Sequence, residues 1–404
     1  MQKEIKKKIL ITSQYLFNDP PTQNTIRSLD KEGHQVIYVE RSYHSVNSKL
    51  FTFDNNRNSE FISINPRFSS GNKLFDKFIN QYIYKRRLNR LIKVTKPDVV
   101  IAIMFHPIDA IVRLRGIKYI AGILDIPPRD NLGKFDKHIY LSAYNKIRDW
   151  DHVWASDELK AQLFQKQVQL KTMPAVCYNC PSLDYFGVLK KNDARCWLRN
   201  KLSSAGCKVD GNTRILLRSG AAGEHSGIEE TIEALKVSRI NCIFLILGRP
   251  SDSYKARLNK LINDYKLNDK VVVWSNPNDE VWKTALLGAD IGHLIQVFDD
   301  NTDPLYVEMN NTNSVLSANR MYQYFAAGLP ILSFNDERLD NIHSEIDCFY
   351  VCNTKQLVKS VQDAFNYFSN NSKWLQTAAG EAKKAYLEKY NWENQFQEIS
   401  NLLY

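Results

Sequence analysis

Short apolar runs recur along this chain with the length and the borders of buried β-strands. Each run is bounded by Gly, Pro, Asn or Asp, and between the runs apolar residues recur every three to four positions, as in amphipathic helices. The runs expected as strands are 8–12, 36–39, 96–103, 119–125, 152–156, 214–220, 242–248, 271–274, 291–295 and 330–333. Strands that alternate with helices predict strand–helix–strand units, and therefore an α/β fold with parallel sheets.

The length of the chain predicts two such domains. At 404 residues it exceeds what a single hydrophobic core usually serves. We expect one Rossmann-like domain over residues 1–195 and a second over 205–386, with the polar stretch 203–206 as the linker. Doubly wound domains bind ligands at the carboxyl ends of their strands, so a cleft between two of them is the expected site.

Composition narrows the class of protein. Apolar residues make up 44% of the chain, which suits well-buried cores, and no apolar run approaches the roughly 20 residues that span a bilayer. The seven scattered cysteines favour a reducing cytoplasm, and the opening MQKEIKKKILIT lacks the features of a signal peptide. Neither Cys177-x-x-Cys180 nor Cys348-x3-Cys352 has a compact His/Cys partner, so we expect no metal.

Positive charge is concentrated in the first half. Residues 1–190 contain 30 Lys and Arg against 18 Asp and Glu, whereas the remainder contains 24 against 26. The sharpest patch, 75–93, reads as a helix with aromatic and aliphatic residues on one face and Lys and Arg opposite. It is either a surface helix packed on its own domain or a docking surface for the anionic inner membrane leaflet. We expect no nucleic-acid partner, because no recognisable binding module accompanies the charge.

The segment 313–331 carries the most specific signal. It reads as a polar loop, a short helix, a glycine stop at Gly328 and a new strand. Asn319 and Arg320 fall in the first helical turn, where free backbone N–H groups and the helix dipole favour an anion. Gln323 follows one turn later, in reach of a second part of the same ligand. An ordinary α/β turn is the alternative interpretation.

This segment resembles the nucleotide-diphosphate-sugar loop of GT-B glycosyltransferases, especially those close to family 4. Four further segments resemble that family in order and spacing: Lys96–Val100, Asn179–Phe186, Ala289–Ile291 and Tyr390–Glu393. The resemblance implies two Rossmann-like domains facing across a cleft, with a last helix, 387–404, crossing back onto the first domain. It also implies that the second domain binds a nucleotide-sugar donor, that the first domain lies on the acceptor side, and that no metal or other cofactor is needed.

Several positions depart from the family pattern. Ala221 and Ser226 replace the two cations of the loop after the first strand of the second domain, and Gln323 and Val315 replace two carboxylates. Arg320, helped by Arg218 or Arg249, must then carry more of the diphosphate. The donor-binding residues that the resemblance implies are Arg218, Gly220, Arg249, Trp274, Ser317, Asn319, Arg320 and Gln323. For Arg218, a structural ion pair at a strand end is the alternative.

Three residues of the first domain are candidates for the chemistry. His106 follows the strand 99–104 and resembles the His that many family-4 enzymes place beside the transferred sugar. Asp125 and Asp130 follow another strand on the same edge. A retaining enzyme needs no protein base, because the leaving phosphate takes the acceptor proton, whereas an inverting enzyme would use one of these three side chains as base.

We therefore expect a cytoplasmic, retaining glycosyltransferase at the inner face of the membrane. It would move a sugar from a nucleotide-diphosphate sugar to a glycan or lipid-linked acceptor in cell-surface polysaccharide synthesis. Two alternatives stay open: an inverting transferase of the same fold, and a catalytically silent subunit that binds sugar or a partner. The four departures, Ala221, Ser226, Val315 and Gln323, favour the silent subunit.

Overall fold

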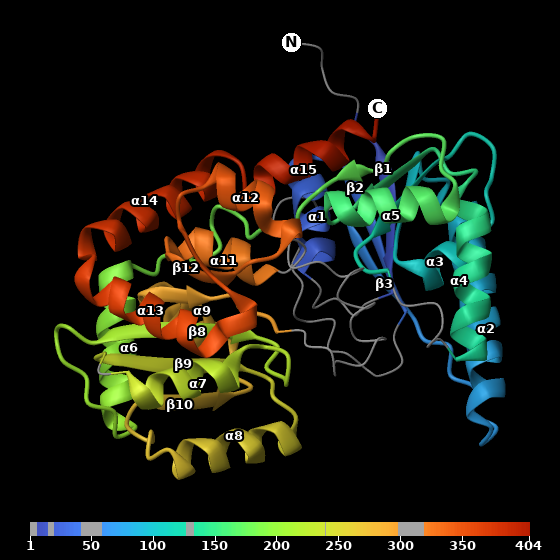
Figure 1. The fold of residues 1–404 in the computed structure, drawn as a ribbon. Helices are drawn as coiled ribbons and strands as arrows, with labels where there is room; N and C mark the ends of the chain where they lie inside the picture. Colours follow the sequence, from blue (N-terminus) through green and yellow to red (C-terminus); the bar gives the residue numbers. More distant parts are fainter. Residues whose placement is uncertain (1–5, 15–19, 42–58, 127–132, 239, 298–318) are drawn as a thin grey trace. The chain divides into compact units, whose positions relative to one another are not determined.

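The chain forms two compact α/β units, each built on one parallel sheet (Figure 1). The computed structural model describes residues 6–14, 20–41, 59–126, 133–238, 240–297 and 319–404. The first unit contains the described residues up to Asn179 together with Trp392–Tyr404, and the second contains those from Cys180 to Asn391. The predicted fold class, two doubly wound parallel sheets, is confirmed.

The first unit has a seven-stranded sheet in the order β3-β2-β1-β4-β5-β6-β7. Its strands are β1 (Lys8–Ser13), β2 (Gln35–Arg41), β3 (Glu60–Ile64), β4 (Val99–Ile103), β5 (Lys118–Ile123), β6 (His152–Ala155) and β7 (Ala175–Val176). Its helices are α1 (Pro20–Lys31), α2 (Lys73–Thr95), α3 (Phe105–Ala110), α4 (Lys134–Ile147), α5 (Glu158–Val168) and α15 (Trp392–Asn401).

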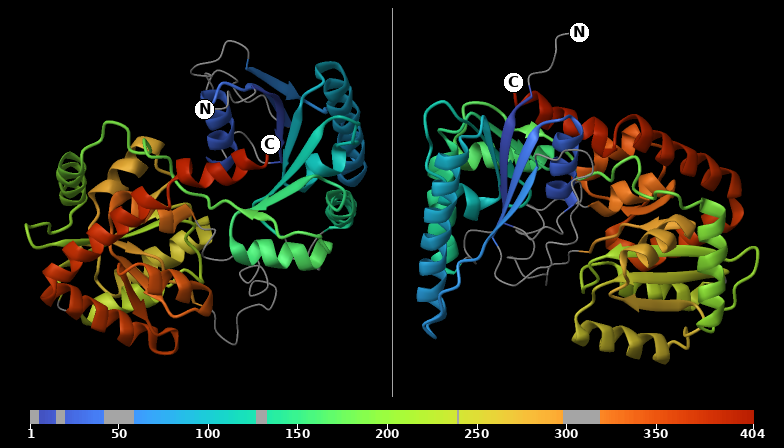
Figure 2. Two further views of the ribbon diagram at one scale, coloured as in Figure 1. Left: turned by 90° about the horizontal axis from the view of Figure 1, so that it is seen from above. Right: turned by 180° about the vertical axis from the view of Figure 1, so that it is seen from behind.

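Helices cover both faces of this sheet, and that explains the uninterrupted apolar runs. α1 and α15 pack together on one face, and α2, α3 and α4 pack together on the other (Figures 1 and 2). All five residues of β4 are therefore buried, as is usual for a central parallel strand. The Trp392 indole N–H donates to the Ser28 hydroxyl of α1 at 2.8 Å, so the last helix is held in the first unit.

The second unit has a six-stranded sheet in the order β10-β9-β8-β11-β12-β13. Its strands are β8 (Arg214–Gly220), β9 (Cys242–Gly248), β10 (Val271–Ser275), β11 (Ile291–His293), β12 (Ile331–Phe334) and β13 (Phe349–Cys352). Its helices are α6 (Lys191–Ser204), α7 (Ile228–Val237), α8 (Asp252–Asp264), α9 (Asp279–Gly288), α11 (Asn319–Ala327), α12 (Asp340–Glu345), α13 (Leu357–Asn370) and α14 (Ser372–Glu388), with 3-10 turns η4 (Glu337–Leu339) and η5 (Thr354–Gln356).

The stretch expected as a linker is the end of a helix. Ser203 and Ser204 form the last turn of α6, which packs against α9 within the second unit. The compact units divide between Asn179 and Cys180, upstream of the boundary at 195–205 that the polar composition suggested. α6 looks polar in sequence because it buries only three side chains, Ala194, Leu198 and Leu202.

Helix α2 changes character along its length. Toward its carboxyl end Leu88 and Ile92 are buried, as a packed surface helix requires. Toward its amino end Leu74, Phe75, Phe78 and Tyr82 are exposed, Phe75 by 50% and Tyr82 by 61%. We call these four residues the α2 stripe. Within the described residues, no helix is both long enough and apolar enough to cross a membrane.

Candidate functional site

The carboxyl ends of β8 and β9 in the second unit meet at two glycines. Gly220 ends β8 with a φ of +95°, and Gly248 ends β9 beside it. A Cβ on Gly248 would collide with the backbone of Gly220, so Gly248 has no room for a side chain, and the positive φ of Gly220 disfavours a side chain there. Such bare backbone at the end of parallel strands is where α/β folds admit a ligand.

Arg320 lies directly against this bare edge. A Cβ on Gly220 would come within 2.9 Å of Arg320 Nη2 and 3.3 Å of its Nε, so the guanidinium packs on the glycine itself. Nη2 donates to the Ala221 carbonyl at 3.3 Å. Among the described residues, Arg320 Nε and Asn319 Oδ1 have no hydrogen-bond partner. Burial lowers the pKa of Arg320, yet a guanidinium remains protonated at neutral pH.

Helix α11 places Arg320 at this edge. The helix starts at Asn319 and ends at Ala327, followed by Gly328 in a left-handed conformation with φ +61°, as the sequence predicted. Tyr324, one turn after Arg320, accepts from Ser219 N at 3.1 Å, and its hydroxyl lies 2.9 Å from the Leu217 carbonyl. Sequence reasoning missed Tyr324, which fixes the helix against β8.

Gln323 is buried and already engaged. Its Nε2 donates to the Tyr185 hydroxyl at 3.0 Å, which leaves Oε1 as the end of the amide that can accept from a ligand hydroxyl. Burial raises the pKa of Tyr185, so this phenol stays neutral. Tyr185 lies in the segment 179–186 that resembled the family, but no role was predicted for it.

The other predicted donor-binding residues differ in how exposed they are. Arg218 is buried, and its Nη1 donates to the Ile295 carbonyl at 2.8 Å, which agrees with a structural role. Arg249 follows β9 and is exposed. Trp274 in β10 is half-buried and packs edge-on against Trp197, with ring centroids 6.2 Å apart. Ser317 lies outside the described residues.

The loop after β8 is closed by its own serine. Ser226 Oγ donates to the Gly223 carbonyl, and α7 begins after Gly227, whose φ is +64°. The position where the family carries a lysine therefore serves the turn here. No Lys or Arg occurs between residues 219 and 227, so this loop offers backbone but no cation to an anion.

In the first unit, His106 lies where β4 passes into α3. Met104, between them, has a φ of +69°, a strained conformation for a residue with a side chain. His106 Nδ1 lies 3.1 Å from Arg41 Nη1, and His106 Nε2 lies 3.6 Å from Asp136 Oδ1. Burial and then the Arg41 charge lower the pKa of His106 to about 4, against the opposing effect of Asp136.

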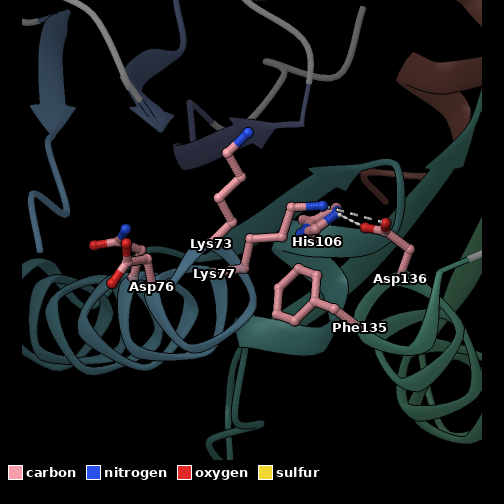
Figure 3. Close-up of a pocket in the computed structure, with 7 residues that line it drawn as sticks. Lys73, Asp76, Lys77, His106, Phe135 and Asp136 are labelled. Atoms are coloured by element: carbon pink, nitrogen blue, oxygen red, sulfur yellow. Dashed lines mark ion pairs between the residues drawn. The ribbon is translucent and has the colours of Figure 1, made fainter. Parts of the chain in front are cut away.

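A pocket of about 790 Å³ opens beside this histidine (Figure 3). Its lining residues come from three helices: Lys73, Asp76, Lys77 and Asn80 from α2, His106 from α3, and Phe135 and Asp136 from α4. Lys77 Nζ lies 3.7 Å from Asp136 Oδ2, so a lysine and a histidine converge on one carboxylate. No sequence pattern pointed to Asp136, whereas Arg41 follows a predicted strand on the same sheet edge.

Asp125, the second predicted catalytic residue, follows β5 and is held by a buried lysine. Lys160 is 0% exposed, and its Nζ lies 3.2 Å from Asp125 Oδ1 and 3.1 Å from Ser156 Oγ. Asp157, also buried, accepts from Lys160 N as the cap of α5. The cluster ties the ends of β5 and β6 together. Asp130 lies outside the described residues.

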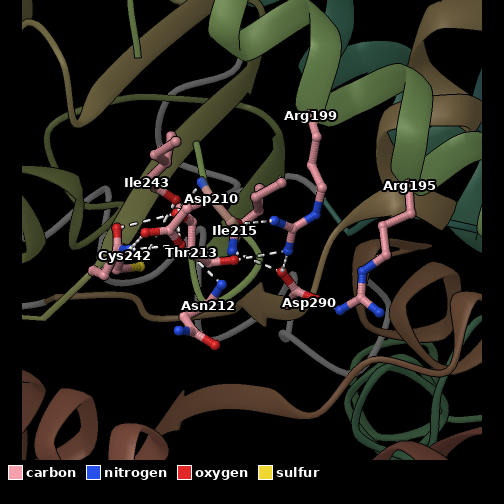
Figure 4. Close-up of polar contacts among 10 residues, drawn as sticks. Arg195, Arg199, Asp210, Asn212, Thr213, Ile215, Cys242, Ile243 and Asp290 are labelled. Carbon is pink, nitrogen blue, oxygen red and sulfur yellow. Dashed lines mark hydrogen bonds and ion pairs between the residues drawn. The ribbon is translucent and has the colours of Figure 1, made fainter. Parts of the chain in front are cut away.

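Asp290, part of the Ala289–Ile291 segment that resembled the family, is an anchor of the second unit (Figure 4). Its carboxylate pairs with Arg195 and, at 3.4 Å, with Arg199, both from α6. The same carboxylate accepts from Ile215 N at 2.9 Å. It therefore joins α6 to the amino end of β8, away from the glycine edge. No group of three or more His, Cys, Asp and Glu suited to a metal occurs in the part of the chain that the structure describes.

Comparison with solved structures identifies proteins that share this fold. No family model matches the sequence, and no curated protein matches it. Among solved structures, a glycosyltransferase from Rickettsia africae ESF-5 shares 15% identity over 99% of this chain and 98% of its own, with a TM-score of 0.70. HepE of Anabaena, in complex with UDP-glucose, shares 12% sequence identity with this chain. The match covers 98% of this chain and 99% of HepE, with a TM-score of 0.69.

A third neighbour is WaaG, a glycosyltransferase involved in lipopolysaccharide biosynthesis, which shares 14% identity over 98% of each chain with a TM-score of 0.61. All three likenesses extend over both units of the present chain. At such low identity they speak to architecture rather than to activity. The chain has the GT-B fold of these glycosyltransferases.

Proposed function

We propose that this protein transfers a sugar from a nucleotide-diphosphate sugar to a glycan or lipid-linked acceptor in cell-surface polysaccharide synthesis, with retention of anomeric configuration. The observation that carries the proposal is Arg320 packed on Gly220, at the bare carboxyl edge of the second sheet. An unpartnered guanidinium N–H at a helix start, beside backbone without side chains, suits a diphosphate.

The chemistry follows from that placement. Cleavage of the sugar–phosphate bond leaves negative charge on the diphosphate, and a preorganised cation stabilises this charge more in the transition state than in the ground state. Arg320 supplies that cation, since the loop 219–227 has none. In a retaining reaction the acceptor hydroxyl proton leaves with the diphosphate, so no protein base is required.

The names of the structural neighbours agree with this chemistry. HepE was crystallised with UDP-glucose, and WaaG is described as acting in lipopolysaccharide biosynthesis. UDP-glucose is therefore the first donor to test. For the acceptor we propose a glycan or a lipid-linked glycan.

The test is a donor panel on the full chain. UDP, GDP, ADP and their sugar conjugates are compared by thermal shift, and the conjugates by release of free sugar. We expect one base to raise the melting temperature in preference to the others, and its sugar conjugate to be hydrolysed slowly. The anomeric configuration of the glycoside formed on an added acceptor then distinguishes retention from inversion. No stabilisation by any nucleotide would refute the proposal.

A second candidate is a catalytically silent subunit that still binds a nucleotide sugar. The loop after β8 favours this candidate, because the Ser226 hydroxyl donates to the Gly223 carbonyl and carries no charge for a diphosphate. In that case the thermal shift would appear without sugar release from any donor.

We further propose that the protein works at the inner face of the membrane and contacts anionic lipid through helix α2, within residues 75–93. The α2 stripe exposes three aromatic rings and a leucine, and Lys73, Lys77 and Arg86 lie on the same helix. Exposed aromatic residues flanked by cations suit the interface of an anionic bilayer.

Vesicle co-sedimentation tests this contact. A Phe75→Ser/Tyr82→Ser variant should lose binding to vesicles that contain phosphatidylglycerol. Val94→Ser, which removes a more exposed apolar side chain at the other end of α2, should bind as the wild type does. Equal sedimentation of the stripe variant and the wild type would remove α2 from the membrane proposal.

A further inference from the structure

A histidine that no sequence pattern pointed to lies in the core of the second unit. His293 ends β11 with no exposed surface, and its ring packs on that of Phe244 from β9, with centroids 5.2 Å apart. A polar ring in such a place needs a partner for each nitrogen. Nε2 lies 2.9 Å from Thr231 Oγ1 in α7, and Nδ1 lies 3.5 Å from Arg218 Nη1 in β8. The ring therefore links the strand before the loop 220–227 to the helix after it.

The two contacts require the same tautomer of the His293 ring. Thr231 Oγ1 has one hydrogen and donates it to the Gly227 carbonyl at 2.6 Å. Nε2 must therefore carry the ring proton and donate to Thr231. A guanidinium can only donate, so Nδ1 must be bare and accept from Arg218. Burial and then the charges of Arg218 and Arg320 lower the pKa of His293, so the ring stays neutral with this single proton.

The two partners of His293 hold opposite ends of the loop after β8. At the start of the loop, Arg218 Nη2 donates to the Ala221 carbonyl at 3.4 Å. At its end, Thr231 Oγ1 donates to the Gly227 carbonyl. One buried ring thus joins both ends of the loop through two side chains, one from the sheet and one from the helix that follows.

The backbone of this loop is held in a form that suits an anion. Within the described residues, the N–H groups of Ala222 and Glu224 donate to no other group. Carbonyl oxygens along the loop, which would repel an anion, accept hydrogen bonds from the protein instead. They are those of Ala221, Gly223, His225 and Gly227. Backbone N–H groups bind anions when the chain is held in such a form, so the shape of the loop matters for binding.

We propose that His293 is a positioning residue for the donor: its ring, bonded to Arg218 and Thr231, holds the loop after β8 in the form whose backbone N–H groups meet the diphosphate. His293 itself does not touch the donor. A loop without Lys or Arg has only its backbone to offer, and a backbone held in advance binds more tightly than one that must be ordered on binding. This inference rests on the proposed function, because the diphosphate is the ligand of that function.

Nucleotide titration of the full chain tests the positioning role. UDP, GDP and ADP are titrated into the wild type by calorimetry, and the one that binds is titrated into the variants. Thr231→Val removes the hydroxyl and keeps the shape of the side chain. We expect it to weaken binding by about fivefold, the loss of one net hydrogen bond. Thr231→Ser, which keeps the hydroxyl, should bind as the wild type does.

The control is Thr284→Val, the same substitution at another buried threonine, in α9, and it should leave the affinity unchanged. Each titration is carried out below the melting temperature of the variant, so that lost folding is not read as lost binding. If one nucleotide binds the wild type and Thr231→Val equally well, the positioning role of His293 fails while the donor proposal stands. If no nucleotide binds the wild type, both proposals fail.

A second measurement tests the tautomer in the wild type itself. A long-range 1H–15N spectrum should show Nε2 of His293 protonated and Nδ1 bare at neutral pH, with the signal assigned by its absence from His293→Gln. Protonation on Nδ1 would overturn the proposal, because the ring could then neither accept from Arg218 nor donate to Thr231.

Discussion

At the two sheet edges described above, an arginine has opposite effects on the local charge. At the edge of the second unit, Arg320 lies on bare glycine backbone, and its Nε has no partner among the described residues. At the edge of the first unit, a cation lies behind a histidine instead, and its effect is to keep that histidine neutral. The same residue type, arginine, presents charge in one place and removes it in the other.

The difference shows that the position of a cation relative to the surface decides its role. Arg320 lies where we propose that the diphosphate binds, whereas Arg41 acts on the protonation of His106. We therefore expect the Arg320 edge to respond to changes of side-chain volume and charge, and the His106 edge to respond to pH.

The largest effect should come from Gly220→Val. The substitution forces a β-branched residue into a φ of +95° and drives its side chain into the Arg320 guanidinium. We expect donor binding to be abolished, with sugar release reduced by more than about 100-fold. Gly223→Ala, in the same loop but with nothing within 4 Å, should retain donor binding in the thermal-shift assay.

Arg320→Ala should come next, with a loss of about 100-fold in kcat/KM for the donor, because no other loop cation replaces it. Arg214→Ala, at the opposite end of strand β8, is the matched control and should keep its activity. Full activity of the Arg320 variant would show that the donor lies elsewhere.

The pH dependence of stability should report on His106. Its folded pKa of about 4 lies below the ordinary value of 6.5, so its contribution is complete above pH 6.5 and is lost as pH falls toward 4. Urea unfolding should show the wild type losing up to about 3 kcal/mol relative to His106→Gln over this range.

The smallest effect should come from Tyr185→Phe. It removes the acceptor for Gln323 Nε2, so the amide is no longer held with Oε1 free to accept. We expect the donor affinity to weaken by about threefold, in line with one neutral hydrogen bond, when measured by titration with the preferred nucleotide. An unchanged affinity would show that Gln323 does not bind the ribose of the donor.

Much of the fold was predictable because parallel strands covered on both faces must be apolar. The runs at 214–220 and 242–248 correspond to β8 and β9 residue for residue. The polar helix α6 was not predictable in this way, because Arg195 and Arg199 bind Asp290, some 90 positions away. Only Ala194, Leu198 and Leu202 of this helix are buried, so its periodic apolar signal is weak.

The residues of the candidate site also divide into those that local sequence predicts and those that only tertiary packing brings together. Arg320 and Gln323 were found because a helix start and a glycine stop lie close together in sequence. Arg41 and His106 are 65 positions apart, and Asp136 belongs to a third helix, so their juxtaposition depends on tertiary packing alone. His106 was identified by its position, but its protonation state required knowledge of what lies behind it.

The hydroxyl of Tyr324 affects how the edge formed by Gly220, Gly248 and Arg320 unfolds. It binds Ser219 N and approaches the Leu217 and His293 carbonyls, so α11 is attached to the central strands of the sheet. Arg320 therefore cannot drift while the core is intact. Amide hydrogen exchange at Ser219 should therefore be as slow as in the strand interior. The edge at Gly220 and Gly248 should open only when the whole unit unfolds.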